Sequence, residues 1–169
     1  MKRKFWPWLA SAAAVVVIIA GSLIFKQHRT TINLDKFSDH MLSSSLYYQG
    51  MEGFAGDNAG IAARYGIDGA DVADARGFAA ADGTSREFAI IKAVSVEKAG
   101  DMMTSFGLYA KDLMDGYSAA GNAEEYQRVR GYVISRTGEY VIFTISDSIG
   151  SGSLAAKTYL DSTIYDQTR

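Results

Sequence analysis

The chain has 169 residues, enough for one domain and an extension, and it contains no cysteine. Disulfides, zinc–cysteine sites and iron–sulfur clusters are therefore excluded. The net charge of −2 hides an asymmetry: the first 29 residues hold five of the 17 basic side chains and none of the 19 acidic ones, so the remainder carries −7. An acidic domain repels phosphate backbones, so we expect no nucleic-acid partner.

Residues 5–25 form an uncharged stretch, FWPWLASAAAVVVIIAGSLIF, with basic residues on both sides. As a helix rising about 1.5 Å per residue it spans roughly 31 Å, which matches a hydrocarbon core of about 30 Å. Trp6 and Trp8 near its start suit the headgroup region. We predict that residues 1–29 are a cytoplasmic tip and a transmembrane signal-anchor, which makes the membrane a partner through residues 5–25.

A cleavable signal peptide is the main alternative to a retained anchor. Such signals have about 7–15 apolar residues followed by small ones, whereas this stretch has 21. The small residues of the stretch end at Ser22, and cleavage there would release a secreted protein. Its new N-terminus, at Leu23, would be exposed and apolar. This favours a retained anchor. Three basic residues before the stretch, against Lys26 and Arg29 after it, predict a cytoplasmic N-terminus and an extracytoplasmic domain rather than the inverted topology.

Residues 30–33 are predicted to be a short polar linker before one domain over residues 34–169. A first helix is expected over residues 34–48, because apolar residues recur there every three or four positions. Residues 50–60 contain four glycines and are predicted to be a loop. A short helical piece follows and ends at Gly66.

Two β-hairpins are predicted in the rest of the domain. The first joins residues 72–80 to residues 86–94, and the second joins residues 132–136 to residues 140–146. Each turn contains a glycine, which tolerates the positive φ angles of tight hairpins. Apolar residues lie on both faces of the strand over residues 86–94, so we expect a central strand that is covered on each side.

The longest helix is predicted over residues 96–117, with Ser95 as its N-cap. Its apolar residues advance in steps of three and four, which favours a core-facing stripe over a cofactor pocket. The stripe consists of Val96, Ala99, Met103, Phe106, Ala110, Leu113 and Tyr117. Shorter helices are expected over residues 123–129 and after Ser153. Consecutive hairpins with helices favour an α+β fold in which an antiparallel sheet of about four strands packs against helices.

No catalytic, cofactor-binding or metal site is predicted. Asp68, Asp71 and Asp74 are spaced by three, whereas a calcium loop places its acids at alternate positions and ends on a Glu, so we interpret them as a solvated face. His40 is the only histidine of the domain, and the serines that follow it share its predicted helix. A Ser-His-Asp unit is therefore not expected.

Two further motifs resemble binding sites only superficially. Residues 149–158 lie where a phosphate loop would lie, but Ser151 and Ala156 replace the glycines that this motif requires, so no nucleotide partner is expected. Tyr47 and Tyr48, beside the glycine-rich loop, could line a ligand groove. Aromatic core packing is the interpretation that we favour for them.

Two segments resemble a known family. Residues 87–103, EFAIIKAVSVEKAGDMM, and residues 138–147, GEYVIFTISD, are similar to the bacterial domain-of-unknown-function family 4358. This family occurs in small exported lipoproteins and single-pass membrane proteins, and the resemblance covers roughly residues 34–160. It implies an envelope location but no activity, substrate, cofactor or catalytic residue. The chain departs from the lipoprotein members because it has no anchoring cysteine.

We therefore expect a non-enzymatic binding or interaction module of the bacterial cell envelope. Its partner would be an envelope protein, a peptide or a wall component. The alternative is a carboxylate-dependent hydrolase acting on an envelope polymer, since 19 acidic residues offer many carboxylate pairs. A cleft with two facing acidic residues would favour the hydrolase. We also expect residues 30–169 to fold alone, without metal or cofactor.

Overall fold

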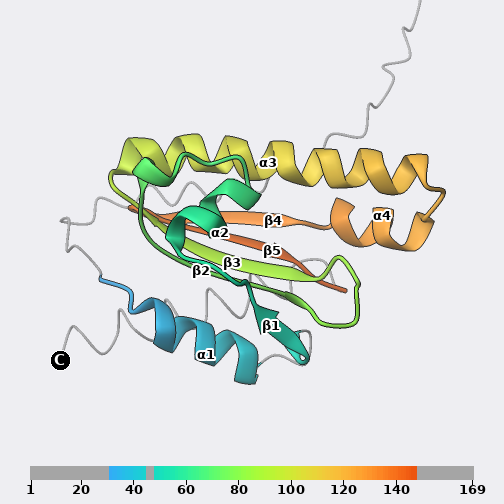
Figure 1. The fold of residues 1–169 in the computed structure, drawn as a ribbon, viewed down its shortest axis with the longest axis horizontal. Helices are drawn as coiled ribbons and strands as arrows, with labels where there is room; N and C mark the ends of the chain where they lie inside the picture. Colours follow the sequence, from blue (N-terminus) through green and yellow to red (C-terminus); the bar gives the residue numbers. More distant parts are fainter. Residues whose placement is uncertain (1–30, 45–47, 148–169) are drawn as a thin grey trace, which may run out of the picture.

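The computed structural model describes residues 31–44 and 48–147. The predicted anchor over residues 5–25 and the helix expected after Ser153 lie outside this part of the chain. The described residues form an α+β fold with a five-stranded antiparallel sheet of order β1-β2-β3-β5-β4 (Figure 1). Across these ranges, no helix combines the length and the apolar character that a membrane crossing requires.

Both predicted hairpins are confirmed, and the sheet has one strand more than the four expected. In chain order the elements are α1 (Leu34–Ser44), β1 (Met51–Gly53), α2 (Asn58–Arg64), the 3-10 turn η2 (Gly69–Asp71), β2 (Val72–Ala80), β3 (Glu87–Ala93), α3 (Val96–Ala119), α4 (Ala123–Arg130), β4 (Val133–Thr137) and β5 (Tyr140–Ile145). The helix α1 lies on one face of the sheet, and α2, α3 and α4 lie on the other (Figure 1).

The prediction of a loop over residues 50–60 is wrong, because this segment contains β1 and the start of α2. The three residues of β1 pair antiparallel with the end of β2. Such a short strand shows no alternation of its own, and its conformation comes from this pairing. The helix α2 begins after Asp57, whose carboxylate accepts a hydrogen bond from the Gly60 N–H at 3.0 Å.

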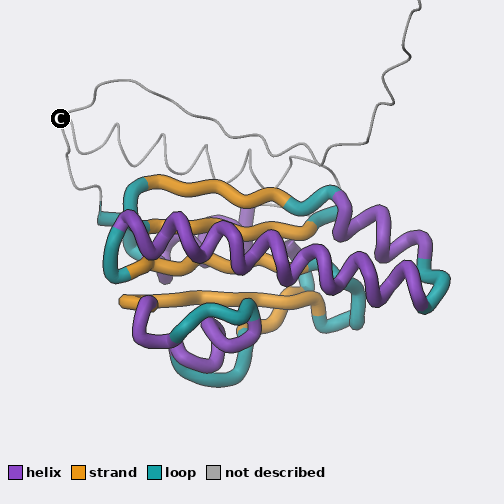
Figure 2. The backbone as a smooth tube through the Cα atoms, turned by 90° about the horizontal axis from the view of Figure 1, so that it is seen from above, coloured by secondary structure: helices purple, strands orange, loops and turns teal. Residues whose placement is uncertain are grey.

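The strand β3 is the central strand that the sequence predicts. It pairs with β2 on one side and with β5 on the other. Phe88 and Ile90 pack in a core on the α1 side, together with Phe37 and Met41, and all four side chains are fully buried. The alternate residues of β3 enter a larger core under α2 and α3. Figure 2 shows the sheet seen from above, with α3 running along it.

The helix α3 confirms the predicted N-cap and corrects part of the predicted stripe. The Ser95 hydroxyl accepts a hydrogen bond from the Lys98 N–H at 3.2 Å. Met102, rather than Met103, is almost fully buried, and Val96 is 48 % exposed. Val96 is the first residue of α3 and follows the last residue of β3 by three positions.

The first helix begins at Leu34 as predicted, and the packed chain begins before it. The described residues of α1 are Leu34–Ser44, and residues 45–47 of the predicted helix lie outside the described part of the chain. Ile32, in the segment predicted as a linker, is 3 % exposed and packs in the α1-side core. Its N–H donates to the Tyr140 hydroxyl at 3.2 Å, which ties the start of the described chain to β5.

Candidate binding groove at the edge of the sheet

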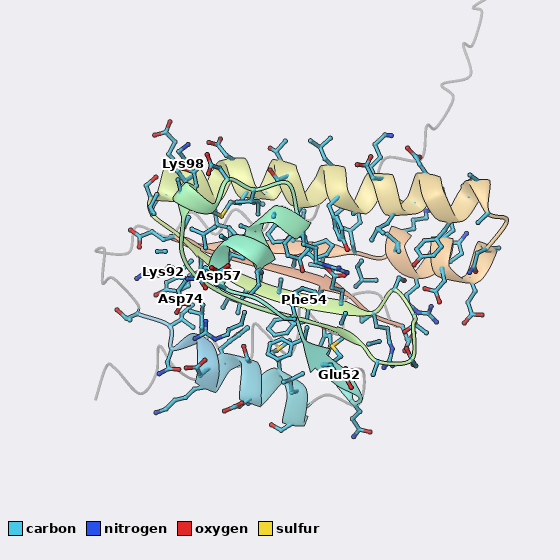
Figure 3. All side chains as sticks on the ribbon, viewed as in Figure 1. Glu52, Phe54, Asp57, Asp74, Lys92 and Lys98 are labelled. Atoms are coloured by element: carbon cyan, nitrogen blue, oxygen red, sulfur yellow. The ribbon has the colours of Figure 1, made fainter. Side chains whose placement is uncertain are left out.

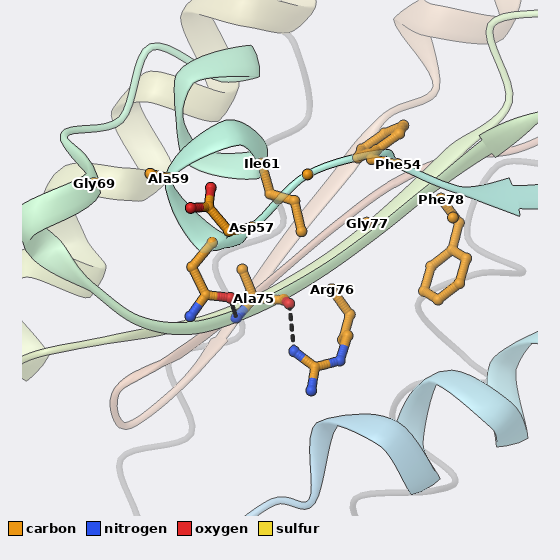
Figure 4. Close-up of a pocket in the computed structure, with 12 residues that line it drawn as sticks. Phe54, Asp57, Ala59, Ile61, Gly69, Ala75, Arg76, Gly77 and Phe78 are labelled. Atoms are coloured by element: carbon orange, nitrogen blue, oxygen red, sulfur yellow. Dashed lines mark hydrogen bonds between the residues drawn. The ribbon is translucent and has the colours of Figure 1, made fainter.

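A groove of about 680 Å³ follows the outer edge of β2 (Figure 4). One wall consists of four consecutive residues of β2, 75–78. The other consists of residues 53–54 and 56–59 with Ile61 and Gly69. Its volume falls within the range of about 300–1,000 Å³ that is usual for ligand pockets. Figure 3 shows Phe54 and Asp57 on the segment that connects β1 to α2 above this edge.

The groove exists because β1 is much shorter than β2. The register between the two strands covers only Phe78–Ala80 of β2. The last backbone bond of this ladder runs from the Phe54 N–H to the Gly77 carbonyl oxygen at 2.9 Å. After Phe54 the chain leaves the sheet to enter α2, so no strand of the described residues lies beside Val72–Arg76 on this side. An edge of this kind exposes backbone groups that pair readily with another strand.

Side chains occupy the backbone groups of this edge. The Asn58 carboxamide accepts a hydrogen bond from the Ala75 N–H at 3.1 Å, and its NH₂ group lies 3.5 Å from the Ala73 carbonyl oxygen. The Arg76 guanidinium donates to the Ala75 carbonyl oxygen at 2.6 Å. The Ala75 N–H also lies 2.9 Å from the Asp74 carboxylate. A side-chain amide at this position imitates one peptide group of the missing strand.

Two further carboxylates lie beside the groove, next to Arg76. Arg76 forms ion pairs of 2.7 Å with Asp35 of α1 and with Asp74. Hydrogen bonds to Asp35 and to Asp74 raise the pKa of Arg76 above its ordinary value. The lining itself contains one carboxylate, that of Asp57, and one guanidinium, that of Arg76, while Asp35 and Asp74 lie beside the groove as the partners of Arg76. The Asp35 and Asp74 side chains are 70 % and 40 % exposed and that of Arg76 is 34 % exposed, so each ion pair contributes little to stability.

Phe54 lies directly on the backbone of β2. A Cβ atom added to Gly77 would lie 2.4 Å from Cδ2 of the Phe54 ring, so residue 77 has no room for a side chain. The guanidinium carbon of Arg64 lies 4.5 Å from the centroid of the same ring. The wall of the groove is thereby fixed between the sheet and the end of α2.

Arg64 also belongs to a buried polar cluster behind the groove, which we call the Glu87 cluster: Arg64, Tyr65, Glu87 and Tyr109. The Glu87 carboxylate is 3 % exposed and accepts hydrogen bonds from Arg64 at 2.7 Å and from the Tyr109 hydroxyl at 2.9 Å. Burial and the negative charge of Glu87 raise the pKa of Tyr65 and that of Tyr109. Both phenols are therefore neutral at physiological pH.

The Glu87 cluster is a structural unit rather than a binding site. It joins the end of α2, the start of β3 and the middle of α3, and none of its four members lines the groove. Glu87 has a charged partner and a hydroxyl donor, which is what a buried carboxylate requires.

The three aspartates at three-residue spacing have three different partners. Asp68 accepts from the Ala70 N–H at 2.9 Å and caps η2, and Asp74 pairs with Arg76. Asp71 pairs with Lys98 at 2.9 Å, at the start of α3 (Figure 3). Within residues 31–44 and 48–147, no three His, Asp or Glu side chains gather in a way that could hold a metal ion.

The remaining sequence candidates lie away from the groove. The Ser43 hydroxyl donates to the Asp39 carbonyl oxygen at 2.6 Å, so it bonds to its own helix rather than to the His40 imidazole. Tyr48 is 1 % exposed and its ring lies 5.8 Å from that of Phe88, which confirms core packing for this tyrosine. Tyr47 and residues 149–158 lie outside the described residues.

Sequence reasoning missed Asn58 and Arg76, the two side chains that occupy the edge of β2. The available signal was Asp57-Asn58 within the glycine-rich stretch, which is typical of a helix start. That signal locates α2 but does not indicate which strand lies beside it. The ion pair between Arg76 and Asp35 spans 41 positions in the sequence, and no local pattern indicates it.

A family comparison supplies the last observation on this region. The model of DUF4358, a domain of unknown function, matches residues 34–146, which is more than half of the chain. The chain belongs to this family. The matched DUF4358 region begins with α1 and ends just after β5, so it includes both walls of the groove and the Glu87 cluster. Comparisons with curated proteins and with solved structures find no match.

Proposed function

We propose that this DUF4358 protein is a membrane-anchored, extracytoplasmic binding module of the bacterial cell envelope and that it binds its partner in the groove beside β2. The observation that carries the proposal is a concave groove along a sheet edge whose backbone groups bond to side chains instead of a strand. The uncharged stretch over residues 5–25 supports the anchor, and the charge asymmetry around it supports an external domain.

The groove gives less support to the hydrolase. Glycoside hydrolases use two facing carboxyl groups about 5–10 Å apart. In the described part of the chain, Asp57 is the one carboxylate that lines the groove, and it caps α2 through the Gly60 N–H. The nearby carboxylates of Asp35 and Asp74 are bound to Arg76. This arrangement supports binding better than acid–base catalysis.

The anchor and its orientation are tested on the full-length protein in cells. We expect the mass of the purified membrane protein to include residues 1–29, and we expect protease added to intact protoplasts to digest the domain. A mature N-terminus near Leu23 would support the secreted alternative. A domain that resists protease until the protoplasts are lysed would support the inverted topology.

Binding in the groove is tested by cross-linking in intact cells. Ala59 lines the groove on α2, whereas Ala63, one turn further along the same helix, is exposed and does not line it. We expect Ala59→Trp to abolish recovery of a partner that wild type and Ala63→Trp both recover. Equal recovery from all three proteins would contradict the groove as the binding site.

A further inference from the structure

We propose that the ligand of the groove is an extended peptide with basic side chains, which adds to β2 as an edge strand opposite Ala75. This inference rests on the proposed function and specifies the chemistry of the partner. Peptide recognition by strand addition uses an exposed sheet edge for affinity and flanking pockets for alternate side chains. The described residues provide the edge, the two flanking surfaces and the charge.

The hydrogen-bonding groups of the edge match a strand. Both the N–H and the carbonyl oxygen of Ala75 point to the groove side, where they bond to Asn58 and Arg76 at 3.1 and 2.6 Å. One residue of an added antiparallel strand offers its carbonyl oxygen to the Ala75 N–H and its own N–H to the Ala75 carbonyl oxygen. The exchange leaves the Ala75 backbone fully paired, and the displaced Asn58 and Arg76 side chains turn to water.

The length of the edge limits the ladder to a few residues. On one side the ladder with β1 ends at the bond from the Phe54 N–H to the Gly77 carbonyl oxygen. On the other side the register between β2 and β3 shifts between Val72 and Asp74, which marks a bulge at Ala73. Bulges twist an edge and stop continued pairing. The edge therefore accepts a short strand rather than a second sheet.

The two sides of the edge differ, and this difference defines a ligand pattern. Figure 4 shows Phe54 and Ile61 on one side of β2 and Phe78 and Arg76 on the other. Asp35 and Asp74 lie with Arg76 on the second side, where their carboxylates bond to its guanidinium. Successive side chains of a strand point to opposite faces. An alternating peptide would thus place apolar side chains against Ile61 and basic ones near the two carboxylates.

The test uses full-length protein in nanodiscs and a fluorescent, end-blocked peptide of alternating lysine and valine. We expect saturable binding by anisotropy and shifts of the Ala75 amide signal by NMR. The same peptide N-methylated at alternate residues has lost the backbone donors along one edge, so we expect its binding through that edge to weaken by roughly fivefold or more. Replacing its lysines by glutamates should weaken binding as well, and added salt should reduce the difference between the two peptides.

Two variants of the protein test the same edge of β2 with the peptide unchanged. Asn58→Ala removes the side chain that the ligand must displace, so we expect the lysine–valine peptide to bind roughly fivefold more tightly. Gln49→Ala, at an exposed position outside the groove, is the matched control and should leave the affinity unchanged. Thermal melting of both variants verifies that each is folded.

Three outcomes would overturn the inference. They are equal binding of the methylated and unmethylated peptides, an unchanged or weaker affinity of Asn58→Ala, and self-association of the protein through this edge with no peptide bound. If Ala59→Trp still abolishes partner recovery in cells, the proposed function stands while the strand-addition inference fails. If Ala59→Trp has no effect there, both fail.

Discussion

The Glu87 cluster and the edge cluster, which we define as Asp35, Asn58, Ala75 and Arg76, contain ion pairs of the same length in different surroundings. The Arg64–Glu87 and Arg76–Asp35 distances are both 2.7 Å. The Glu87 side chain is 3 % exposed and that of Asp35 is 70 % exposed. The two distances therefore do not show which ion pair matters more for stability. The exposure of each pair to water does.

The comparison separates polar groups that the fold requires from groups that a ligand can replace. Removing a partner from a buried pair leaves a charge that water cannot solvate. Removing a partner from an exposed pair returns the other side chain to water at little cost. The Glu87 cluster is thus expected to hold α2, β3 and α3 together, whereas the edge cluster is able to exchange its partners.

Replacement of Glu87 is the strongest test of this contrast. Glu87→Ala leaves Arg64 and the Tyr109 hydroxyl without their acceptor, and we expect a loss of about 3 kcal/mol in the free energy of unfolding, at the low end for a broken buried pair because Arg64 is 41 % exposed. Urea unfolding followed by circular dichroism measures it. Glu87→Gln keeps an acceptor and should lose less. A loss no larger than that of Asp35→Ala would break the comparison.

The second test acts on Phe54, whose ring lies between Gly77 of β2 and Arg64 of the Glu87 cluster. Gly77→Ala places a Cβ within 2.4 Å of the Phe54 ring, so the ring must move away from β2 and from Arg64. We expect a loss of about 2 kcal/mol from this overpacking. Gly107→Ala, in α3 with no atom within 4 Å of the added Cβ, is the control and should stabilise slightly. Phe54→Ala in the Gly77→Ala background should recover part of the loss.

The strands and the long helix could be predicted because each carries a repeating pattern. The strand β3 has apolar residues on both faces, and α3 has an apolar residue every three or four positions. These patterns report how one element meets the core. Ser95 could be predicted as a cap for a related reason, since a cap bonds within its own helix.

The groove and the Glu87 cluster could not be predicted in the same way. Arg64, Glu87 and Tyr109 are separated by more than 20 positions each and meet only after α2 and α3 pack on β3. The strand β1 has three residues, too few for an alternation, and its early end is what opens the edge of β2. Both features depend on where elements stop relative to one another, which local periodicity does not encode.

Raising the pH tests the Glu87 cluster without a substitution. Burial and the Glu87 charge raise the pKa of Tyr65 and that of Tyr109 above the ordinary 10.0, so the folded state keeps protons that the unfolded state releases. The contribution of these two phenols to the free energy of unfolding is therefore fully present below pH 10. It falls as the pH rises above 10, by up to about 1.4 kcal/mol per pH unit for each phenol. Urea unfolding at increasing pH measures the slope, and Tyr109→Phe should reduce it. An unchanged slope in this variant would contradict the role of Tyr109.

The smallest effect is expected at the edge cluster. Asp35→Asn removes one exposed carboxylate from Arg76, which keeps Asp74 at 2.7 Å, so we expect a change of at most about 0.5 kcal/mol in the free energy of unfolding. This small change should disappear at high salt, because exposed pairs are screened within about 10 Å at 0.1 M. Parallel urea titrations at low and high salt measure it, with Glu87→Gln as the buried counterpart that salt affects little. A large, salt-independent loss in Asp35→Asn would mean that the edge cluster stabilises the fold as strongly as the Glu87 cluster does, and that a ligand could not displace its side chains at little cost.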